Sequence, residues 1–132
     1  MSFEAETARI HVRVEPSFLA QESDPAESRF LWAYTIEIEN RSDALVQLIS
    51  RHWRITDANG MTQEVKGPGV VGEQPVLQPG ESFTYTSGCP LATSSGLMVG
   101  SYQMIRLPTR ESFEIAIPAF ALDSPFADRR AN

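Results

Sequence analysis

Apolar and polar side chains alternate over several short stretches of the chain, which is the pattern of a β-strand with one buried face. In residues 30–39 every second position is apolar, namely Phe30, Trp32, Tyr34, Ile36 and Ile38. Residues 9–15 place Ile10, Val12 and Val14 on the inward face and Arg9, His11, Arg13 and Glu15 on the outward face. Phe113, Ile115 and Ile117 repeat the pattern near the end of the chain. Each stretch predicts a half-buried strand.

Residues 45–57 predict another strand, whose apolar positions Leu45, Ile49, Trp53 and Ile55 share one face. Asn59-Gly60 follows, and this pair tolerates the positive φ angles of a type I′ turn, so we expect a hairpin into residues 61–66. Residues 82–87 and 98–107 are further strand candidates. Pro79-Gly80 presets a turn before the first of these.

No stretch combines a 3.6-residue periodicity with capping residues, and residues 24–29 come closest, so helix should be scarce. Seven or eight short strands separated by turns predict an all-β chain, an antiparallel β-sandwich of the fibronectin type III or immunoglobulin-like kind. A small β-barrel is the alternative. The 132 residues suffice for a single domain, 1–132. We expect the first few residues and the tail 127–132 to fray, since they lack a pattern to bury.

The charge balance limits the classes of partner. With 11 basic and 17 acidic residues the net charge is −6, which argues against binding the phosphate backbone of nucleic acid. The longest apolar run, residues 115–122, contains Pro118 and is shorter than the roughly 20 residues that cross a membrane, so no membrane association is expected. Cys89 has no internal disulfide partner and the first residues do not resemble a signal peptide, which favours a reducing cytoplasm.

Residues 67–72, Gly-Pro-Gly-Val-Val-Gly, match the G-x-G-x-x-G pattern of dinucleotide-binding turns. That turn leads from a strand into a helix, whereas Pro75 and Pro79 interrupt the residues that follow here. A weaker phosphate site stays open, in which successive backbone N–H groups form an anion-binding nest beside a lysine. Its residues would be Lys66, Gly67, Gly69, Val70, Val71 and Gly72. The favoured interpretation is structural: the glycines allow a crossing, or an approach to another backbone, where a Cβ atom would clash.

Residues that ligate metals or act as nucleophiles are few. His11, His52 and Cys89 are the only His and Cys residues, and no pair has the spacing of a zinc site. Nothing in the sequence brings His52 to Cys89 as a catalytic base. We therefore expect no catalytic residues, no resident metal and no cofactor, although a weak Mg²⁺ site among surface carboxylates stays open.

Residues 50–54, Ser-Arg-His-Trp-Arg, are a candidate contact surface, because Trp and Arg are enriched in interface hot spots. Trp53 shares the face of Ile49 and Ile55, which favours a place in the core. Arg51 would then cover the core's edge with its stem. The tentative interaction residues are Arg51 and His52.

Four runs of residues together resemble the ApaG family. They are His52-Trp-x-Ile-x-Asp57-x-x-Gly60, Glu64-Val-x-Gly-x-Gly-Val-Val-Gly72-x-x-Pro75, Leu77-x-Pro-Gly80-x-x-Phe-x-Tyr85-x-Ser-Gly88-x-Pro-Leu91 and Gly96-x-Met-x-Gly-x-Tyr-x-Met104. The match extends over about residues 8–126. The resemblance implies a fibronectin type III-like sandwich, bacterial origin, and an association with cobalt resistance and magnesium homeostasis. It supplies no catalytic residues.

Two functions are consistent with these observations. The first is a non-enzymatic binding module that contacts another protein through an exposed sheet face or edge strand and affects cobalt and magnesium only indirectly. The alternative is a small-molecule sensor that holds pyrophosphate or a nucleotide at Lys66 and the glycine-rich residues. The oligomeric state is left open by the sequence.

Overall fold

The computed structural model describes residues 1–127, and they are almost entirely β-structure, as predicted. The nine strands are β1 (Phe3–Thr7), β2 (Ile10–Phe18), β3 (Phe30–Asn40), β4 (Leu45–Asp57), β5 (Thr62–Pro68), β6 (Val76–Leu77), β7 (Ser82–Leu91), β8 (Gly96–Leu107) and β9 (Glu111–Leu122). Helix within this range is limited to two 3₁₀ turns, Ala20–Glu22 and Pro25–Glu27. The strand count exceeds the predicted seven or eight because the short strands β1 and β6 were not foreseen.

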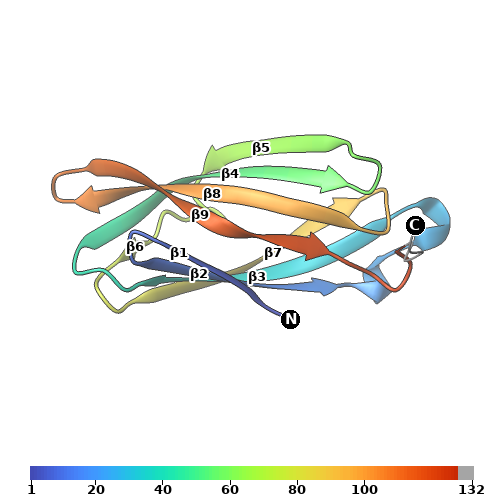
Figure 1. Ribbon diagram of the computed structural model, residues 1–132, viewed down its shortest axis with the longest axis horizontal. Helices are drawn as coiled ribbons and strands as arrows, with labels where there is room; N and C mark the ends of the chain where they lie inside the picture. Colours follow the sequence, from blue (N-terminus) through green and yellow to red (C-terminus); the bar gives the residue numbers. More distant parts are fainter. Residues whose placement is uncertain (128–132) are drawn as a thin grey trace.

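The strands form two antiparallel sheets that pack face to face as a β-sandwich (Figure 1). The first sheet has the order β1-β2-β3-β7, and the second has the order β5-β4-β8-β9 with β6 paired to β4. The predicted sandwich is therefore confirmed over the small barrel. In the second sheet, strands distant in sequence become neighbours, because β4 pairs with both β5 and β8.

The alternation predicted for β3 is confirmed, since its side chains are buried at every second position. Trp32 is among the largest buried side chains, and its indole Nε1 donates a hydrogen bond to the carbonyl of Asp123 at 2.7 Å. Ile10, Val12 and Val14 in β2 are buried as expected. These side chains meet those of the second sheet to form one core.

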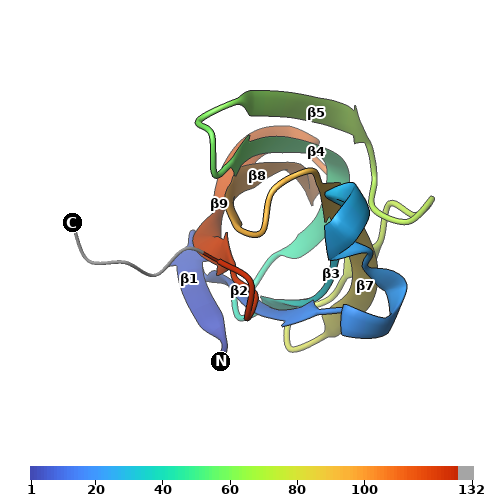
Figure 2. The same cartoon turned by 90° about the vertical axis from the view of Figure 1, so that its right-hand side faces the viewer.

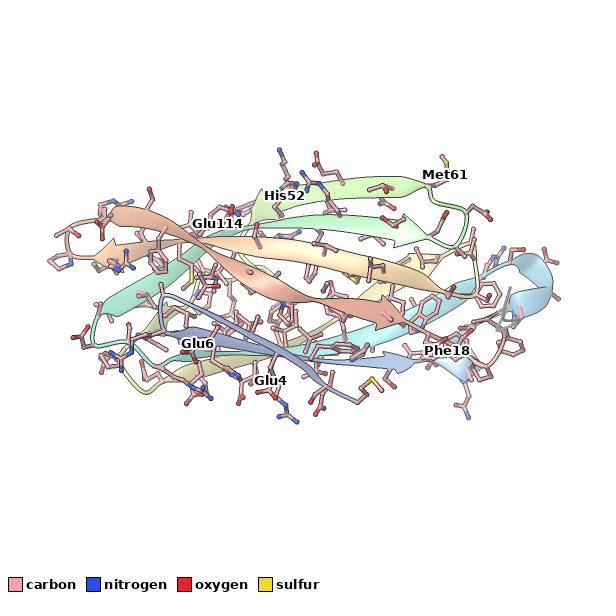
Figure 3. The ribbon with its side chains drawn as sticks, in the orientation of Figure 1. Glu4, Glu6, Phe18, His52, Met61 and Glu114 are labelled. Carbon is pink, nitrogen blue, oxygen red and sulfur yellow. The ribbon has the colours of Figure 1, made fainter. Side chains whose placement is uncertain are left out.

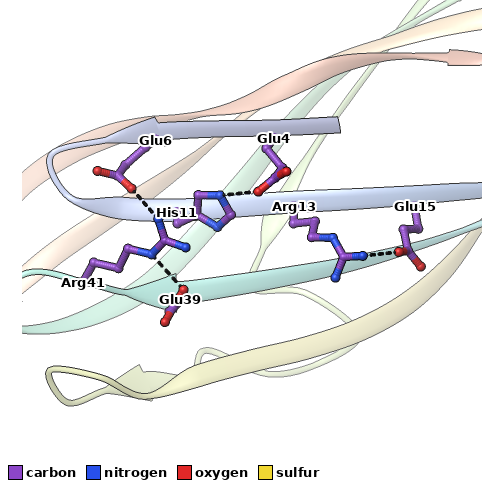
Figure 4. A network of polar contacts seen from close by, with 7 residues as sticks. All are labelled: Glu4, Glu6, His11, Arg13, Glu15, Glu39 and Arg41. Carbon is purple, nitrogen blue, oxygen red and sulfur yellow. Dashed lines mark hydrogen bonds and ion pairs between the residues drawn. The ribbon is translucent and has the colours of Figure 1, made fainter. Parts of the chain in front are cut away.

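His11 was predicted to face solvent, and this was wrong: only 8% of the residue is exposed. It lies on the outer face of the first sheet, opposite Glu6 on β1 and Glu39 on β3. Its Nε2 atom is 2.8 Å from a carboxylate oxygen of Glu4 (Figure 4). The neighbouring strand β1, which the sequence did not predict, places Glu4 and Glu6 beside the imidazole.

β4 keeps the predicted inward positions of Trp53 and Ile55 but not those of Leu45 and Ile49. In the first half of the strand Val46 and Leu48 are buried instead. The register with β8 shifts between Leu48 and Ser50, and such a bulge moves the following side chains to the other face. As a result Arg51 follows the inward alternation of Trp53 and Ile55.

The predicted hairpin between β4 and β5 is confirmed, but its turn is wider than type I′. Gly60 has a φ of 82°, whereas Asn59 is not among the residues with positive φ. The Asp57 carboxylate accepts hydrogen bonds from the N–H groups of Asn59 and Met61, at 2.9 and 3.0 Å. This side-chain cap stabilises a longer loop that needs only one left-handed residue.

The two lateral sides of the sandwich differ (Figure 2). On one side β1 and β9 contact each other, and the N–H of Ala116 donates to the hydroxyl of Thr7 at 3.2 Å. The expectation that the first residues fray is thus wrong for residues 3–7, which pair with β2. On the other side the edges of β5 and β7 leave an opening, and the loop after β5 lies there. Of the tail 127–132, which was predicted to fray, residues 128–132 lie outside the described residues.

Candidate functional site

The opening between β5 and β7 contains two adjoining hollows, which we call the open cleft. One hollow has a volume of about 240 Å³ and the other about 410 Å³. Four residues line both of them, Tyr34, Arg51, Trp53 and Ser87. Volumes of a few hundred cubic ångströms are typical of sites for small molecules or for inserted side chains.

Arg51 occupies the centre of the open cleft and is held there by the backbone of the glycine-rich loop. Its Nη1 atom donates to the carbonyls of Pro68 and Gly69, at 3.0 and 2.9 Å. Gly67 pairs with Arg51 across the strands, and a Cβ atom on Gly67 would lie 3.1 Å from the same Nη1. The missing side chain at Gly67 therefore leaves room for the guanidinium group.

Tyrosine hydroxyls surround the inner part of the open cleft. The hydroxyl oxygens of Tyr85 and Tyr102 are 2.6 Å apart in the core, and Tyr34 lines the cleft beside Ser87. Burial raises the pKa of all three tyrosines, and the nearby charge of Arg51 only partly opposes this effect. The hydroxyls therefore stay neutral at physiological pH, and those of Tyr85 and Tyr102 already share a hydrogen bond with each other.

The glycine-rich loop forms a tight turn, not an open nest of four N–H groups. The N–H of Gly69 donates to the carbonyl of Ile49, and Val70 and Glu73 exchange two hydrogen bonds, all at 2.8 Å. Val71 and Gly72 at the tip have φ angles of 43° and 81°. Two of the four N–H groups of the predicted phosphate nest are therefore occupied by the chain itself.

Gly69 has the structural role that the sequence favoured for these glycines. Its φ is 61°, and a Cβ atom would lie 2.3 Å from the carbonyl oxygen of Glu73. No side chain fits such an approach between two backbones. Val70 anchors the loop to the core, whereas Val71 is 55% exposed at the tip.

Neither His52 nor Lys66 lines the two hollows of the open cleft. His52 and Lys66 alternate with Arg51 and Gly67, so they lie on the outer face of the second sheet. Figure 3 shows His52 on this face, as it does Glu114. The Nε2 atom of His52 is 2.9 Å from a carboxylate oxygen of Glu64, and this neighbour lowers the pKa of Glu64. Arg51 and His52 line a third hollow together, of about 300 Å³, with Lys66 and Gly67, whereas only Arg51 of this predicted pair also lines the open cleft.

A shallow hollow of about 470 Å³ also lies on this outer face, between His52, Ser101 and Glu114. Two of its polar side chains, Ser101 and Glu114, accept hydrogen bonds from the neighbouring Gln103, at 3.0 and 2.9 Å. Ser101 has no histidine as a hydrogen-bond partner. In residues 1–127 no group of three His, Cys, Asp or Glu side chains is placed to hold a metal ion.

Cys89 lies in the open cleft, inward from the first sheet, while His52 lies on the outer face of the second. The structure therefore does not bring this thiol and imidazole together. Burial raises the pKa of Cys89 to about 11, which is the opposite of what a nucleophilic cysteine needs.

The outer face of the first sheet carries a chain of ion pairs (Figure 4). Arg41 contacts Glu6 at 3.0 Å and Glu39 at 2.8 Å, and so connects β1 to β3. These pairs are exposed and lie between neighbouring strands. They fasten the short strand β1 to the sheet rather than form a cleft.

The edge strand β7 differs from the other edges in its composition. Its ten residues, Ser-Phe-Thr-Tyr-Thr-Ser-Gly-Cys-Pro-Leu, include no charged side chain. In contrast, β1, β5 and β9 each carry at least one glutamate. Charges on an edge strand discourage the addition of a further strand, and β7 lacks this protection.

The sequence indicated Arg51 as a tentative interaction residue but did not indicate the tyrosines around it. One signal was present, because Arg51 alternates with Trp53 and Ile55, which were both assigned to the core. The positions of Tyr34, Tyr85 and Tyr102 relative to Arg51 depend on the packing of two sheets. No spacing along the chain contains that information.

Comparison with known proteins gives consistent results. The family model described as the ApaG domain matches residues 20–106. "Protein ApaG" of Rhodospirillum centenum is 60% identical over 126 residues, which is 96% of each chain. "Protein ApaG" of Methylorubrum extorquens is 61% identical over 127 residues, 96% of this chain and 97% of that one. The crystal structure of a putative ApaA protein from Bordetella pertussis superposes with a TM-score of 0.86 at 43% identity, covering 93% of this chain and 99% of the other.

Residues 1–127 contain no helix with the length and apolar character that crossing a membrane requires.

Proposed function

Because the chain belongs to the ApaG family, we propose that it is a non-enzymatic binding module that contacts another protein through the edge strand β7. The observation that carries this proposal is the uncharged, ten-residue edge of β7 beside an open cleft. An exposed edge offers backbone N–H and C=O groups to an extended segment of a partner.

The open cleft would supply specificity for such a segment. In an added strand, alternate side chains point to the same face as the inward side chains of β7. That face leads into the hollow between Val65 on β5 and Cys89 on β7. One or two apolar side chains of the partner would fit against Trp53 there, while main-chain hydrogen bonds to β7 provide most of the affinity.

The association with cobalt resistance and magnesium homeostasis, which the family resemblance implies, is indirect in this proposal. The protein would act on metal levels through the partner that it binds at β7. No step of the proposal requires bond making by this chain.

Lysine substitution on β7 tests the protein contact. Thr84 is exposed on β7, and a lysine there introduces the kind of charge that protects the other edges. We expect the immobilised protein to recover a saturable partner from an extract of its own cells, and Thr84→Lys to reduce that recovery at least tenfold. Ser112→Lys is the matched control, since Ser112 is equally exposed on the distant edge strand β9. Equal recovery by both variants, or no saturable partner for the unmodified protein, would contradict the proposal.

A second candidate function is a small-molecule sensor that holds a phosphorylated ligand at the tip of the glycine-rich loop. It is supported by the exposure of Val71 beside Gly72, whose N–H groups make no hydrogen bond with residues 1–127. Backbone amide shifts confined to residues 66–72 on addition of pyrophosphate are expected for this function. Unchanged spectra at millimolar pyrophosphate would remove it.

A further inference from the structure

We propose that the open cleft binds a small oxyanion, a carboxylate or phosphate group, on the guanidinium of Arg51. Val71 and Gly72 at the tip of the glycine-rich loop line the same hollow, but the anion-binding group proposed here is the Arg51 side chain and not the N–H groups of the loop. The site does not depend on the docking of a protein at β7. It lies under the loop, in the hollow of about 410 Å³ between the two sheets.

Arg51 is an inward-facing charge that has no counter-ion in residues 1–127. No carboxylate in residues 1–127 lies within ion-pair distance of it, whereas Arg13, Arg41, Arg54 and Arg106 all have such a partner. Its two hydrogen bonds go to neutral carbonyls and both use Nη1. Placing a charge in a partly buried position is costly unless it is paired, so an anion from outside the chain would satisfy it.

Two donor atoms of the Arg51 guanidinium remain for a ligand. Nε and Nη2 of Arg51 donate to no acceptor in residues 1–127. These two atoms form the edge of the guanidinium that binds a carboxylate or phosphate with two parallel hydrogen bonds. Because Nη1 is fixed by the loop, that edge is oriented before a ligand arrives, which lowers the entropy lost on binding.

The side chains that line the hollow also favour an anion. Its polar side chains besides Arg51 are the hydroxyls of Tyr34, Tyr85 and Ser87, and it contains no Asp or Glu. Hydroxyl groups donate to oxyanions, while carboxylates would repel them. In a chain with 17 acidic residues and a net charge of −6, a hollow whose one charged side chain is a cation favours anions over cations.

The walls of the site indicate the size of the ligand. Trp53 and Val70 provide apolar surface in the same hollow. The volume of about 410 Å³ accommodates a small organic acid or a phosphorylated metabolite better than a single inorganic ion.

The test is a titration of the full chain, observed through the Nε–Hε signal of Arg51 in an NMR spectrum and through heat in calorimetry. The probes are inorganic phosphate, pyrophosphate and citrate, which separate phosphate from carboxylate recognition. We expect saturable binding of at least one probe, with shifts of the Arg51 Nε–Hε signal and of the Tyr34 and Ser87 amides. Chloride at the same ionic strength should produce no saturable shift.

Two variants and one control keep the test decisive. Arg51→Gln is expected to weaken binding at least tenfold, and Tyr34→Phe, which leaves the loop contacts intact, about threefold. Arg54→Gln should not change the affinity, because Arg54 lies on the outer face of the same strand and pairs with Glu64. An unchanged affinity in Tyr34→Phe and in folded Arg51→Gln would overturn the proposal. So would shifts confined to residues 66–72, or flat titrations with all three probes.

Discussion

At the scale of single residues, close contacts between backbone atoms and aromatic rings determine which positions in the core can carry a side chain. Gly100 on β8 is the clearest case. A Cβ atom there would lie 2.6 Å from Cε3 of the Trp53 ring and 2.8 Å from the carbonyl oxygen of His52. Trp53 forms a wall of the open cleft, so the absence of a side chain at Gly100 helps to position the cleft.

Gly100→Ala is therefore expected to lower the free energy of unfolding by about 2–3 kcal/mol, because Trp53 must move out of a packed site. Gly60→Ala is the comparison, since Gly60 has a φ of 82° but open space around it. Backbone strain alone should cost that variant about 1 kcal/mol. Urea denaturation measures both, and an equal loss in the two variants would contradict the packing argument.

The thiol of Cys89 gives a second prediction at this scale. A pKa of about 11 leaves only about one thiol in ten thousand ionised at neutral pH. Labelling with a disulfide reagent should be slower in the folded protein than in urea by on the order of a hundredfold. Equally fast labelling in both states would mean that the cleft does not bury this side chain.

At the scale of elements, the strands with large apolar residues at alternate positions were predictable, and the short or interrupted ones were not. The alternation of β3 can be seen in its own sequence, whichever strands pair with it. β1 has only Phe3 as a large apolar residue, and its pairing depends on Glu4 and Glu6 meeting residues of later strands. The bulge after Leu48, which leaves Val46 and Leu48 buried in place of Leu45 and Ile49, has no local signal either.

Phe3→Ala tests the docking of β1. The Phe3 ring packs against Phe120 of β9, with ring centroids 6.2 Å apart. Its removal is expected to cost about 1–2 kcal/mol, less than full burial would, because Phe3 is only partly buried. Hydrogen exchange should accelerate in β1 while the β4–β5 hairpin stays protected. Uniform acceleration over both sheets would instead assign Phe3 to the common core.

The pairing of β4 with β5 predicts a pH effect. His52 lowers the pKa of Glu64, so the carboxylate stabilises the folded state at neutral pH. This contribution is lost as the pH falls below the ordinary pKa of glutamate and through the lowered value in the folded protein. Glu64→Gln should show a smaller loss of stability over that acidic range than the unmodified protein. An identical pH profile in thermal unfolding would show that the pair contributes nothing.

At the scale of the whole molecule, the sandwich has one closed and one open side. Contact between β1 and β9 closes the first, and the second combines the uncharged edge of β7 with the cleft around Arg51. The fold class followed from alternation along the chain. The cleft did not follow from this alternation. Arg51 and Tyr34 belong to different sheets and come together only in the folded sandwich.

The most direct test of binding at the open side is photo-cross-linking in living cells. A photoreactive amino acid is placed at position 84 on β7 or, as the control, at position 112 on β9, with the rest of the chain unchanged. We expect a discrete adduct to one protein from position 84 and none from position 112. An adduct from position 112 alone, or from neither position, would contradict it.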